Sequence, residues 1–352
     1  MVDWTRSMEQ TFEYYIVDPA TWKDVSRLNN IKSSTINRDS GAETLGSATI
    51  DVTESVGECY IRVYLITIQN GLTEKHPLGT FLVQTPNSTF DGKIRNVSMD
   101  AYTPLLELKE KQPPLGFSLM DGDNVMDNLY RLTRENLRAP VVKTEAPDTI
   151  YNGFVANTSD TWMTYLIDLA SYAKYEFDLD ELGRVLFSPK KDTASLQPVW
   201  TYDDGNSSIL CPSINLEHDM YGIPNSVEVI YSDGKNYYYS KVVNDDSNSP
   251  TSTVNRGREI PYRVTNPGFS GVPTQDMIDE YAERTLRELS TLEYTVSYSH
   301  GYNPVRLGDC VRFDYPRAGL VDIKAKVVSQ SIKCEPGCLV SEKAVFTKKL
   351  WG

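Results

Sequence analysis

The sequence predicts an α+β protein in which strands predominate. Short runs of alternating, aromatic or β-branched residues, separated by turn signals, fill roughly the first 112 residues and the region after residue 200. Between these two regions the spacing of apolar residues changes to the helical period. We therefore expect three domains: a β domain over residues 1–112, a small α+β domain over residues 113–200, and a second β domain over residues 201–352 with a helix near residues 274–290.

In the first region, strand patterns cover residues 12–17, 47–52 and 60–68. The segment 60–68 is apolar on both faces, which predicts a strand covered on both sides. Turns are predicted at Asn70-Gly71 and at Pro77-Leu78-Gly79, after which residues 80–85 resume a strand. Asp91-Gly92 indicates a hairpin before residues 93–99. This pattern is typical of a β-barrel or a β-sandwich.

In the middle region, residues 123–137 have helical apolar spacing, and Pro140 helps to end that helix. A second helix is expected to begin near Ser159 or Asp160, since either side chain can cap it. Its apolar stripe consists of Trp162, Leu166, Leu169, Ala170 and Ala173. Strands over residues 175–180 and 184–188 follow, joined by a turn at Glu181-Leu182-Gly183. The unit is thus helix, strand, turn, strand.

In the last region, strands are predicted over residues 225–231 and 237–243, with a turn at Asp233-Gly234. The polar segment 244–253 is expected to be an exposed loop. Thr274 caps a predicted helix, and strands follow over residues 291–298, 310–315, 325–332 and 344–347. Leu78-Gly79 and Leu307-Gly308 both precede a strand, a turn and another strand, which is a faint sign of an internal duplication.

The composition restricts the class of partner. The chain has 352 residues, 35 Lys plus Arg and 48 Asp plus Glu, and therefore a net charge of −13. This acidic balance argues against a nucleic-acid backbone or an anionic membrane as the main partner. No apolar stretch is long enough to cross a bilayer, and the N-terminus lacks the apolar core of a secretory signal. We expect folding in a cytoplasm, where five cysteines form no disulfide framework.

Motifs that carry chemistry are scarce. The sequence contains neither a GxGxxG nor a P-loop pattern, and Gly268-Phe-Ser-Gly271 has the wrong spacing for a nucleophile elbow. Only three histidines are present, which lowers the expectation of nucleophile-plus-base catalysis. We interpret His218-Asp219 as a solvated turn. The sequence therefore predicts no enzyme and no cofactor, and we assign no catalytic, cofactor-binding or metal-ligating residue.

Three further groups of residues allow two interpretations each. Cys334 and Cys338 bracket Glu-Pro-Gly; without a second ligand pair we expect a hairpin turn, and whether the two thiols pair stays open. The segment that begins at Asp178 fails the twelve-residue calcium-loop pattern at its fifth position, Leu182, and at its twelfth, Pro189. We interpret the other acidic clusters, Asp203-Asp204-Gly205-Asn206 and Asp245-Asp246, as turns. The tyrosines at 237–239, 294, 298, 302 and 315 either line a binding surface or reflect strand preference.

The order of these features resembles the baseplate hub proteins of phage tails, the family that joins the tail tube to the central spike or tip. Residues 60–68 followed by Pro77-Leu-Gly-Thr-Phe-Leu-Val83 look like its first tube-type barrel. Residues 161–188, with the Asp-Glu-Leu-Gly hairpin and Val-Leu-Phe, are similar to its small α+β domain. Pro224-Asn-Ser-Val-Glu-Val229 resembles the strand that re-enters the second barrel, and Pro304-Val-Arg-Leu-Gly-Asp309 followed by Val311 resembles the closing segment.

The resemblance implies a homotrimer in which each subunit contributes two tube-like β-barrels, with the α+β domain between them and a helix-containing insertion in the second. Three subunits would then match a six-fold tube to a three-fold spike and form part of the channel for DNA ejection. The implied partners are the chain itself, the tail tube or distal tail protein, the central spike or tip protein, and as a further candidate the tape measure protein. The implied location is the tail baseplate or tip of a virion, assembled in the host cytoplasm.

Several alternatives stay open at this point. A carbohydrate-binding or glycosidase-like tail-tip protein acting on the host wall is the main one, and a carboxylate pair in a cleft would favour it. The sequence does not separate contractile from non-contractile tails, nor a phage from a phage-derived injection particle. Some relatives carry a lytic or receptor-binding extension; because this chain ends at Gly352, just after the last predicted strand, we expect any such activity to come from a partner.

Overall fold

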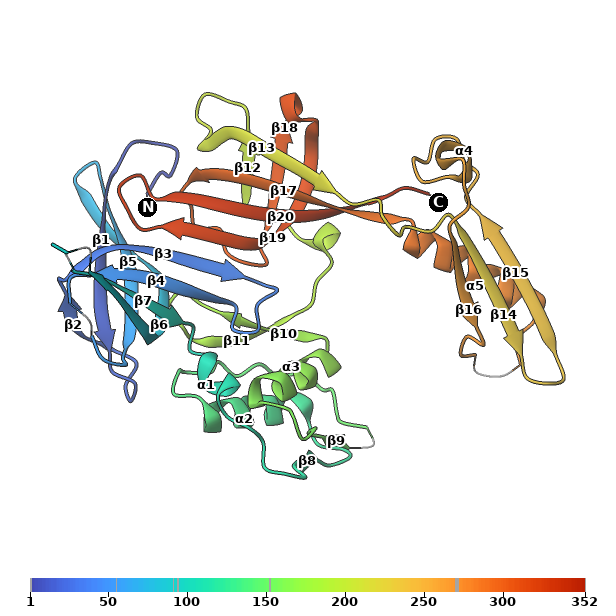
Figure 1. Ribbon diagram of the computed structural model, residues 1–352, viewed down its shortest axis with the longest axis horizontal. Helices are drawn as coiled ribbons and strands as arrows, with labels where there is room; N and C mark the ends of the chain where they lie inside the picture. Colours follow the sequence, from blue (N-terminus) through green and yellow to red (C-terminus); the bar gives the residue numbers. More distant parts are fainter. Residues whose placement is uncertain are drawn as a thin grey trace. The chain divides into compact units, whose positions relative to one another are not determined.

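The structure is a computed structural model that describes residues 2–54, 56–90, 92–93, 95–151, 153–269 and 272–351 (Figure 1). Strands make up 46% and helices 15% of it, so the predicted predominance of β structure is confirmed. Asp91 of the predicted hairpin and Ser270 and Gly271 of the rejected nucleophile elbow lie outside the described residues. None of the helices it describes has the length and apolar character needed to cross a membrane.

The chain forms two compact units. Unit 1 comprises Met1–Ile214 and Tyr298–Ala344, and unit 2 comprises Asn215–Ser297 and Val345–Gly352.

The first 102 residues of unit 1 form seven strands: β1 (Glu9–Val17), β2 (Asp24–Leu28), β3 (Ile31–Asp39), β4 (Gly46–Val52), β5 (Tyr60–Gln69), β6 (Leu72–Phe90) and β7 (Arg95–Tyr102). They pair in the order β3-β4-β7-β6-β5-β1-β2, and every pair is antiparallel. Strand β5 is buried from Tyr60 through Thr67, which confirms the prediction of a strand covered on both sides. We did not predict β2 or β3.

The predicted turn at Pro77-Leu78-Gly79 is wrong, because these residues lie inside β6. Pro77 stands opposite Tyr64 and Gly79 opposite Val63, with a shift of register between the two pairs. Such an irregularity accommodates a proline, which cannot donate to a ladder. A Cβ on Gly79 would come within 2.5 Å of the Phe81 ring, so a larger residue here would displace that ring.

Six further strands follow the middle domain: β12 (Trp200–Asp203), β13 (Leu210–His218), β17 (Thr291–Gly301), β18 (Cys310–Tyr315), β19 (Leu320–Lys333) and β20 (Leu339–Lys349). A short 3-10 turn, Pro316–Ala318, separates β18 from β19. The strands pair in the order β13-β17-β20-β19-β18-β12. The predicted strands over residues 291–298, 310–315, 325–332 and 344–347 all lie within them.

The two sets of strands repeat one topology. In pairing order, β3, β4, β7, β6, β5 and β1 correspond to β13, β17, β20, β19, β18 and β12. Equivalent backbone hydrogen bonds mark the correspondence: Val83 N donates to Cys59 O at 3.0 Å, and Val327 N donates to Asp309 O at 2.9 Å. The copies differ at one edge, since β1 is antiparallel to β5 whereas β12 is parallel to β18.

The faint sequence sign of a duplication was wrong in its residues. Leu78-Gly79 lies within β6, whereas Leu307-Gly308 precedes β18, the counterpart of β5. The two pairs therefore do not occupy equivalent positions. Among the described residues the pairing order stays open at its ends, so the two-barrel architecture is not confirmed.

The two halves of unit 1 meet along one antiparallel ladder between β3 and β19 (Figure 1). Ser329 to Lys333 pair with Asp39 to Thr35, and Ile36 and Ile332 in this ladder belong to one buried core. The side chain of Arg38 donates to Gln330 Oε1 at 3.0 Å, and Ser331 Oγ donates to Asn37 Oδ1 at 2.8 Å. The halves thus share a continuous sheet and a common core.

The middle part of unit 1, which we call the middle domain, runs from residue 105 to residue 199 and so begins before the expected boundary. It contains α1 (Leu106–Lys109), α2 (Val125–Asn136), α3 (Trp162–Tyr172) and the strand pairs β8 (Ser118–Leu119) with β9 (Phe154–Val155) and β10 (Tyr175–Leu179) with β11 (Val185–Pro189). A 3-10 turn, Thr193–Ser195, follows. The predicted stripe of α3 is buried in one core with Leu129 and Leu132 of α2. Thr161 caps α3 instead of Ser159 or Asp160, because Asp160 Oδ2 accepts from Asn157 N.

Unit 2 contains a sheet in the order β15-β14-β16, built from β14 (Ser226–Ser232), β15 (Tyr237–Val243) and β16 (Pro261–Thr265), with α4 (Thr253–Arg256) and α5 (Gln275–Leu289). Thr274 caps α5 as predicted, and Ile278, Ala282 and Leu286 pack on Val227 and Val229.

The prediction of an exposed loop over residues 244–253 is correct only in part: Asp245 to Asn248 and Pro250 are exposed, whereas Thr253 begins α4. Asn244, Ser249, Thr251 and Ser252 in this segment are buried. Asn244 Nδ2 donates to Ser249 Oγ at 2.9 Å, and Thr253 N donates to Asn244 O at 2.9 Å. These polar groups bond to one another, so the polarity of the segment did not require solvent.

Candidate functional site

The turn between β10 and β11, Asp180 to Gly183, is held by its own backbone and by both halves of unit 1. Asp180 Oδ1 accepts from Leu182 N at 3.0 Å and from Arg184 N at 2.8 Å. Gly183 has φ +75°, which favours glycine. The acidic residues here fold the turn, as expected from the failure of the calcium-loop pattern. We call Asp180 to Gly183 the junction turn.

The first half of unit 1 binds the junction turn at one backbone carbonyl, that of Leu182. Leu182 O accepts hydrogen bonds from Trp22 Nε1 at 2.8 Å, Thr80 Oγ1 at 2.9 Å and an Arg62 guanidinium nitrogen at 3.2 Å. Arg62 is buried and forms an ion pair with Asp24 at 2.8 Å. A Cβ on Gly183 would come within 2.7 Å of Thr80 Cβ, so the backbone approaches more closely than any other residue allows.

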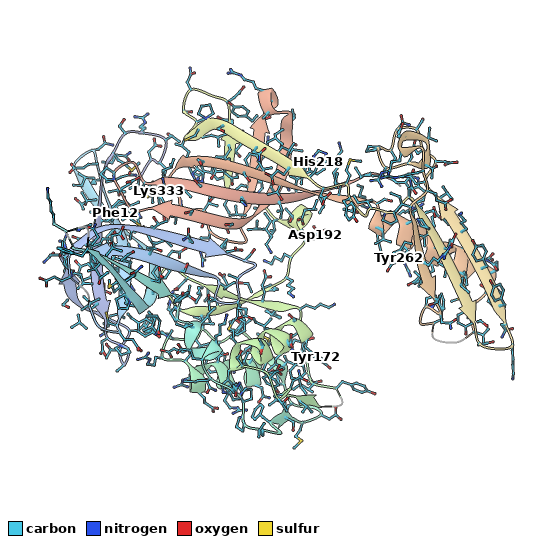
Figure 2. All side chains as sticks on the ribbon, in the orientation of Figure 1. Phe12, Tyr172, Asp192, His218, Tyr262 and Lys333 are labelled. Carbon is cyan, nitrogen blue, oxygen red and sulfur yellow. The ribbon has the colours of Figure 1, made fainter. Side chains whose placement is uncertain are left out.

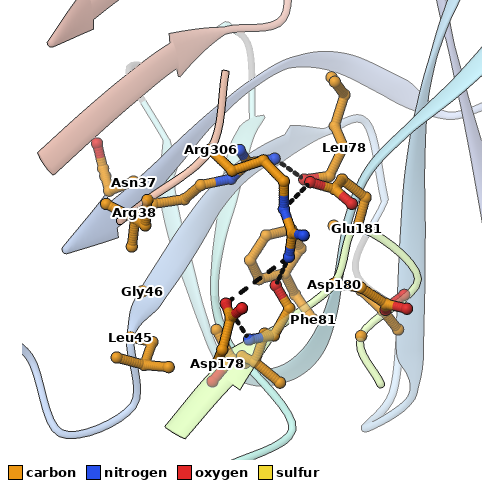
Figure 3. A pocket seen from close by; sticks show the side chains of 16 residues that line it. Asn37, Arg38, Leu45, Gly46, Leu78, Phe81, Asp178, Asp180, Glu181 and Arg306 are labelled. Atoms are coloured by element: carbon orange, nitrogen blue, oxygen red, sulfur yellow. Dashed lines mark hydrogen bonds and ion pairs between the residues drawn. The ribbon is translucent and has the colours of Figure 1, made fainter. Parts of the chain in front are cut away.

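The second half of unit 1 contacts the same turn through Arg306 (Figure 3). Its guanidinium donates to Leu179 O at 2.7 Å and forms ion pairs with Glu181 at 2.6 Å and Asp178 at 3.7 Å. Arg38 lines the same cavity and donates to Leu78 O at 2.6 Å. The cavity measures about 50 Å³, which admits a few water molecules and no organic ligand. These contacts connect the middle domain to both halves of unit 1. We call the junction turn together with Trp22, Arg62, Thr80 and Arg306 the joint.

A larger cavity of about 510 Å³ lies beside the joint, lined by Glu176, Asp178, Asp309 and Lys326 among others. Burial raises the pKa of Asp178, although Arg306 acts in the opposite direction, and burial likewise raises the pKa of Asp309. A carboxyl with a raised pKa is suited to donate a proton. However, Asp178 Oδ1 accepts from Leu179 N and Asp309 Oδ2 accepts from Arg306 N, so each carboxylate is already hydrogen-bonded to the backbone.

A buried polar network occupies the second half of unit 1 and centres on Glu342. Its carboxylate accepts from Tyr298, Gln330 and Tyr202, and it lies 3.2 Å from His300 Nε2. Burial works to raise the pKa of Glu342, but hydrogen bonds from His300, Tyr298 and Gln330 outweigh it and hold that pKa below its usual value. Because these side chains are closed to solvent, the network stabilises the core and offers no substrate site.

Sequence reasoning missed this network, although one signal was present. On β20, the inward positions are Val340, Glu342 and Ala344, so a glutamate stands where alternation calls for an apolar residue. A buried carboxylate at such a position must be hydrogen-bonded.

The candidates raised from the sequence do not gather into one site. The predicted turn at His218-Asp219 is correct only for Asp219: its Oδ1 accepts from Tyr221 N at 2.7 Å, whereas His218 ends strand β13 and its ring packs on Tyr294. Asp203 and Asp246 also accept from backbone groups two residues on, which confirms those turns. Across the part of the chain that the structure describes, no three His, Cys, Asp or Glu side chains could hold a metal ion together.

Cys334 and Cys338 are free thiols buried in the core that the two halves of unit 1 share. Burial raises the pKa of Cys334 to about 12 and raises that of Cys338 further above its usual value. The hairpin turn expected between β19 and β20 is present, with Cys338 N donating to Glu335 O at 2.8 Å.

The tyrosines divide between the two interpretations. Tyr298 and Tyr302 are buried, so a binding surface is wrong for them. Tyr237 and Tyr239 are 66% and 42% exposed on β15, whereas Tyr238 packs against the core of unit 2. Tyr262 on β16, labelled in Figure 2, is 46% exposed.

No protein-family model matches this chain, and no curated protein matches it in sequence. Solved structures do match it in fold. The tail protein from Neisseria meningitidis MC58 superimposes with a TM-score of 0.64 at 13% identity, over 97% of this chain and 98% of that one. The 43 kDa tail protein of prophage MuSo2 from Shewanella oneidensis gives 0.63 at 11% identity, over 95% and 98%.

A Francisella PdpA–VgrG complex gives a TM-score of 0.57 at 8% identity, over 97% of this chain and 58% of that one. The matches to both tail proteins span almost the whole length of each chain. The resemblance to phage tail baseplate proteins is thus confirmed at the level of the fold: this chain has the fold of phage tail proteins.

Proposed function

We propose that the chain is a structural hub of a phage tail or a phage-derived particle. In this proposal it joins the six-fold tail tube, or the distal tail protein, to a three-fold central spike or tip and forms part of the channel for DNA ejection. It acts as a homotrimer, without catalysis or cofactor, and lies in the tail baseplate or tip. The shared fold with tail proteins supports the setting.

The repeated strand order is the observation that carries this proposal. A three-fold assembly meets a six-fold tube only if each subunit presents two equivalent surfaces. The sheets β3-β4-β7-β6-β5-β1 and β13-β17-β20-β19-β18-β12 supply two such surfaces within one chain. Three copies therefore present six, whether or not each sheet closes into the tube-like barrel that the resemblance implies for residues 1–112 and 201–352.

The joint supports the same proposal. An adaptor between two symmetries must hold its two tube-facing halves at a fixed spacing. The ladder between β3 and β19 joins them directly, and the junction turn is bonded to both through Leu182 and Arg306. The middle domain, over residues 113–200 in the proposed division, thus braces the pair.

The charge of the chain supports passage of DNA. Three copies, each with a net charge of −13, would carry −39 together. On β4 and β7, Asp51 and Asp100 alternate with the buried Ile50 and Met99 and so lie on the sheet face opposite the core. An acidic wall repels the DNA backbone and lets it pass without being retained.

Absolute mass in solution tests the proposal. The monomer mass is 39.7 kDa, so light scattering behind a sizing column should report about 119 kDa over a range of concentrations. A strict monomer at every concentration would overturn the homotrimer.

One observation favours a second function, a carbohydrate-binding or glycosidase-like tail-tip protein. The cavity of about 510 Å³ has the size of a ligand site and is lined by two carboxyls, Asp178 and Asp309, whose pKa values burial raises. Incubation with host cell-wall glycan distinguishes the two. Release of reducing ends that is lost in Asp309→Asn would establish this function, and no release is expected for a hub.

A further inference from the structure

The contact between the two halves of unit 1 shows how one copy of the repeated sheet binds another. Strand β19 has β20 on one edge and two partners in succession on the other: β18 runs beside Leu320 to Lys326, and β3 runs beside Ser329 to Lys333. The stretch next to β3 is well covered, since Gln330 and Ile332 are 3% and 1% exposed.

This contact is heterologous, because it joins two different edges of the repeated sheet. Strand β19 is the counterpart of β6, and β3 is the counterpart of β13. One chain therefore uses up the β3 edge of its first half and the β19 edge of its second half. The corresponding edges of the opposite halves are β13 and the end of β6, and neither carries an equivalent ladder in the part of the chain that the structure describes.

Strand β13 fits the role of an incoming edge. It stands at the end of the strand order and pairs only with β17 among the described residues. None of its nine residues is buried: Leu210, Cys211 and Ile214 are half-buried, and the other six, Leu216 among them, are exposed. Leu216 is an exposed large apolar side chain.

The end of β6 fits the role of the receiving edge. Its pairing with β5 stops at Leu82 opposite Tyr60, and the last backbone bond there is the one from Val83 to Cys59. Beyond it, Pro86, Asn87, Thr89 and Phe90 are exposed, in contrast to the covered stretch of β19. Phe90 is 69% exposed. Ser88 has interactions of its own within the chain, so the argument rests on the residues on either side of it.

We infer that copies of this chain join head to tail, with β13 of one copy adding as a strand beside residues 86–90 of β6 in the next. The inference rests on the proposed hub function and names the surfaces through which the trimer forms. The new ladder repeats the pairing of β3 with β19, and it covers Leu216 and Phe90. A head-to-tail contact of this kind closes into a ring when its rotation allows. Three copies would then form a ring of six sheets joined by alternating internal and intermolecular ladders.

Site-specific photocrosslinking tests this pairing. In Phe90→p-benzoylphenylalanine, an aromatic photoreactive side chain replaces the exposed ring at the receiving edge. The matched control is Leu72→p-benzoylphenylalanine, which lies on the same strand, is 66% exposed, and stands where β5 already covers the edge. Equal amounts of ¹⁴N- and ¹⁵N-labelled full-length chain are mixed, irradiated and digested, and the joined peptides are sequenced by mass spectrometry.

The expected result is a crosslink from residue 90 to the peptide that contains residues 210–218, with mixed isotopes, and a loss of that product in the control. A trimer by light scattering whose crosslinks fall on another segment, or form equally in the control, overturns the pairing and leaves the hub proposal standing. A chain that is monomeric at every concentration and gives no crosslink between copies overturns both.

Discussion

The indole Nε1 of Trp22 donates a 2.8 Å hydrogen bond to the carbonyl oxygen of Leu182, across 160 residues of sequence. Trp22 has φ +55°, a conformation that bulky residues rarely adopt. The surrounding structure compensates for the strain of this backbone conformation. The bond therefore anchors the middle domain to the first half of the sheet. The predictions below start from this joint.

Gly183→Ala should lower the free energy of unfolding by about 1–3 kcal/mol, since it adds both a strained φ and a Cβ within 2.7 Å of Thr80. Gly122→Ala is the matched control: Gly122 lies in the same domain with φ +84°, and its Cβ would meet nothing within 4 Å. Urea unfolding of both variants separates strain from packing. Equal losses of unfolding free energy in the two variants would show that Thr80 moves to accommodate the added methyl group and that the joint is loosely packed.

Arg62→Met should cost about 2–3 kcal/mol, because it leaves Asp24 with only the Tyr64 hydroxyl as a partner and removes one donor from the carbonyl of Leu182. This is the low end of the usual cost, as the Asp24 side chain is 24% exposed. Arg27→Met serves as control, since Arg27 is half exposed in its pair with Glu13 and should cost less than about 1 kcal/mol. Thermal or urea unfolding that ranks the two variants in the reverse order would argue against a buried anchor at Arg62.

Glu342→Gln should destabilise the protein at pH 7 by about 1.5–3 kcal/mol, because it weakens hydrogen bonds that a charged acceptor receives. The folded pKa of Glu342 lies below its ordinary value of 4.5, so its contribution is present above about pH 4.5 and is lost as pH falls through the folded pKa. Urea midpoints measured from pH 7 to pH 3 should therefore converge for the two proteins at acid pH. A difference that is constant over this range would contradict the assignment.

Thiol labelling should distinguish the cysteines by burial. Cys334 and Cys338 lie in the shared core with raised pKa values, so a maleimide should modify them only after unfolding. Cys211 on β13 is half-buried, is chemically free and should react in the native chain. Mass spectrometry after a timed pulse reads each site. Rapid native labelling of Cys338 would mean that the seam between β3 and β19 opens.

The elements that could be predicted from the sequence are those whose pattern is local. The stripes of α3 and α5 and the two-sided burial of β5 each follow from side-chain periodicity within one segment. The small α+β unit with its turn at Glu181-Leu182-Gly183 was found in the same way.

The errors arose where a distant segment decides the outcome. Pro77 has the local pattern of a turn, but in the fold it lies opposite β5, at a shift of register that accommodates a proline. The polarity of the residues around Asn244 predicts exposure to solvent, but Asn244 and Ser249 are buried because they bond to each other. The joint went unseen because Trp22, Thr80 and Leu182 meet only in the folded chain, and nothing in the sequence around any one of them marks its partners.

The central claim is that one chain carries two equivalent sheets, so that three chains present six. Electron microscopy of the purified trimer, classified without imposed symmetry, tests it most directly. The account predicts rings with six evenly spaced densities around a central opening. Rings with three unequal densities and no opening, or linear chains of subunits, would contradict it.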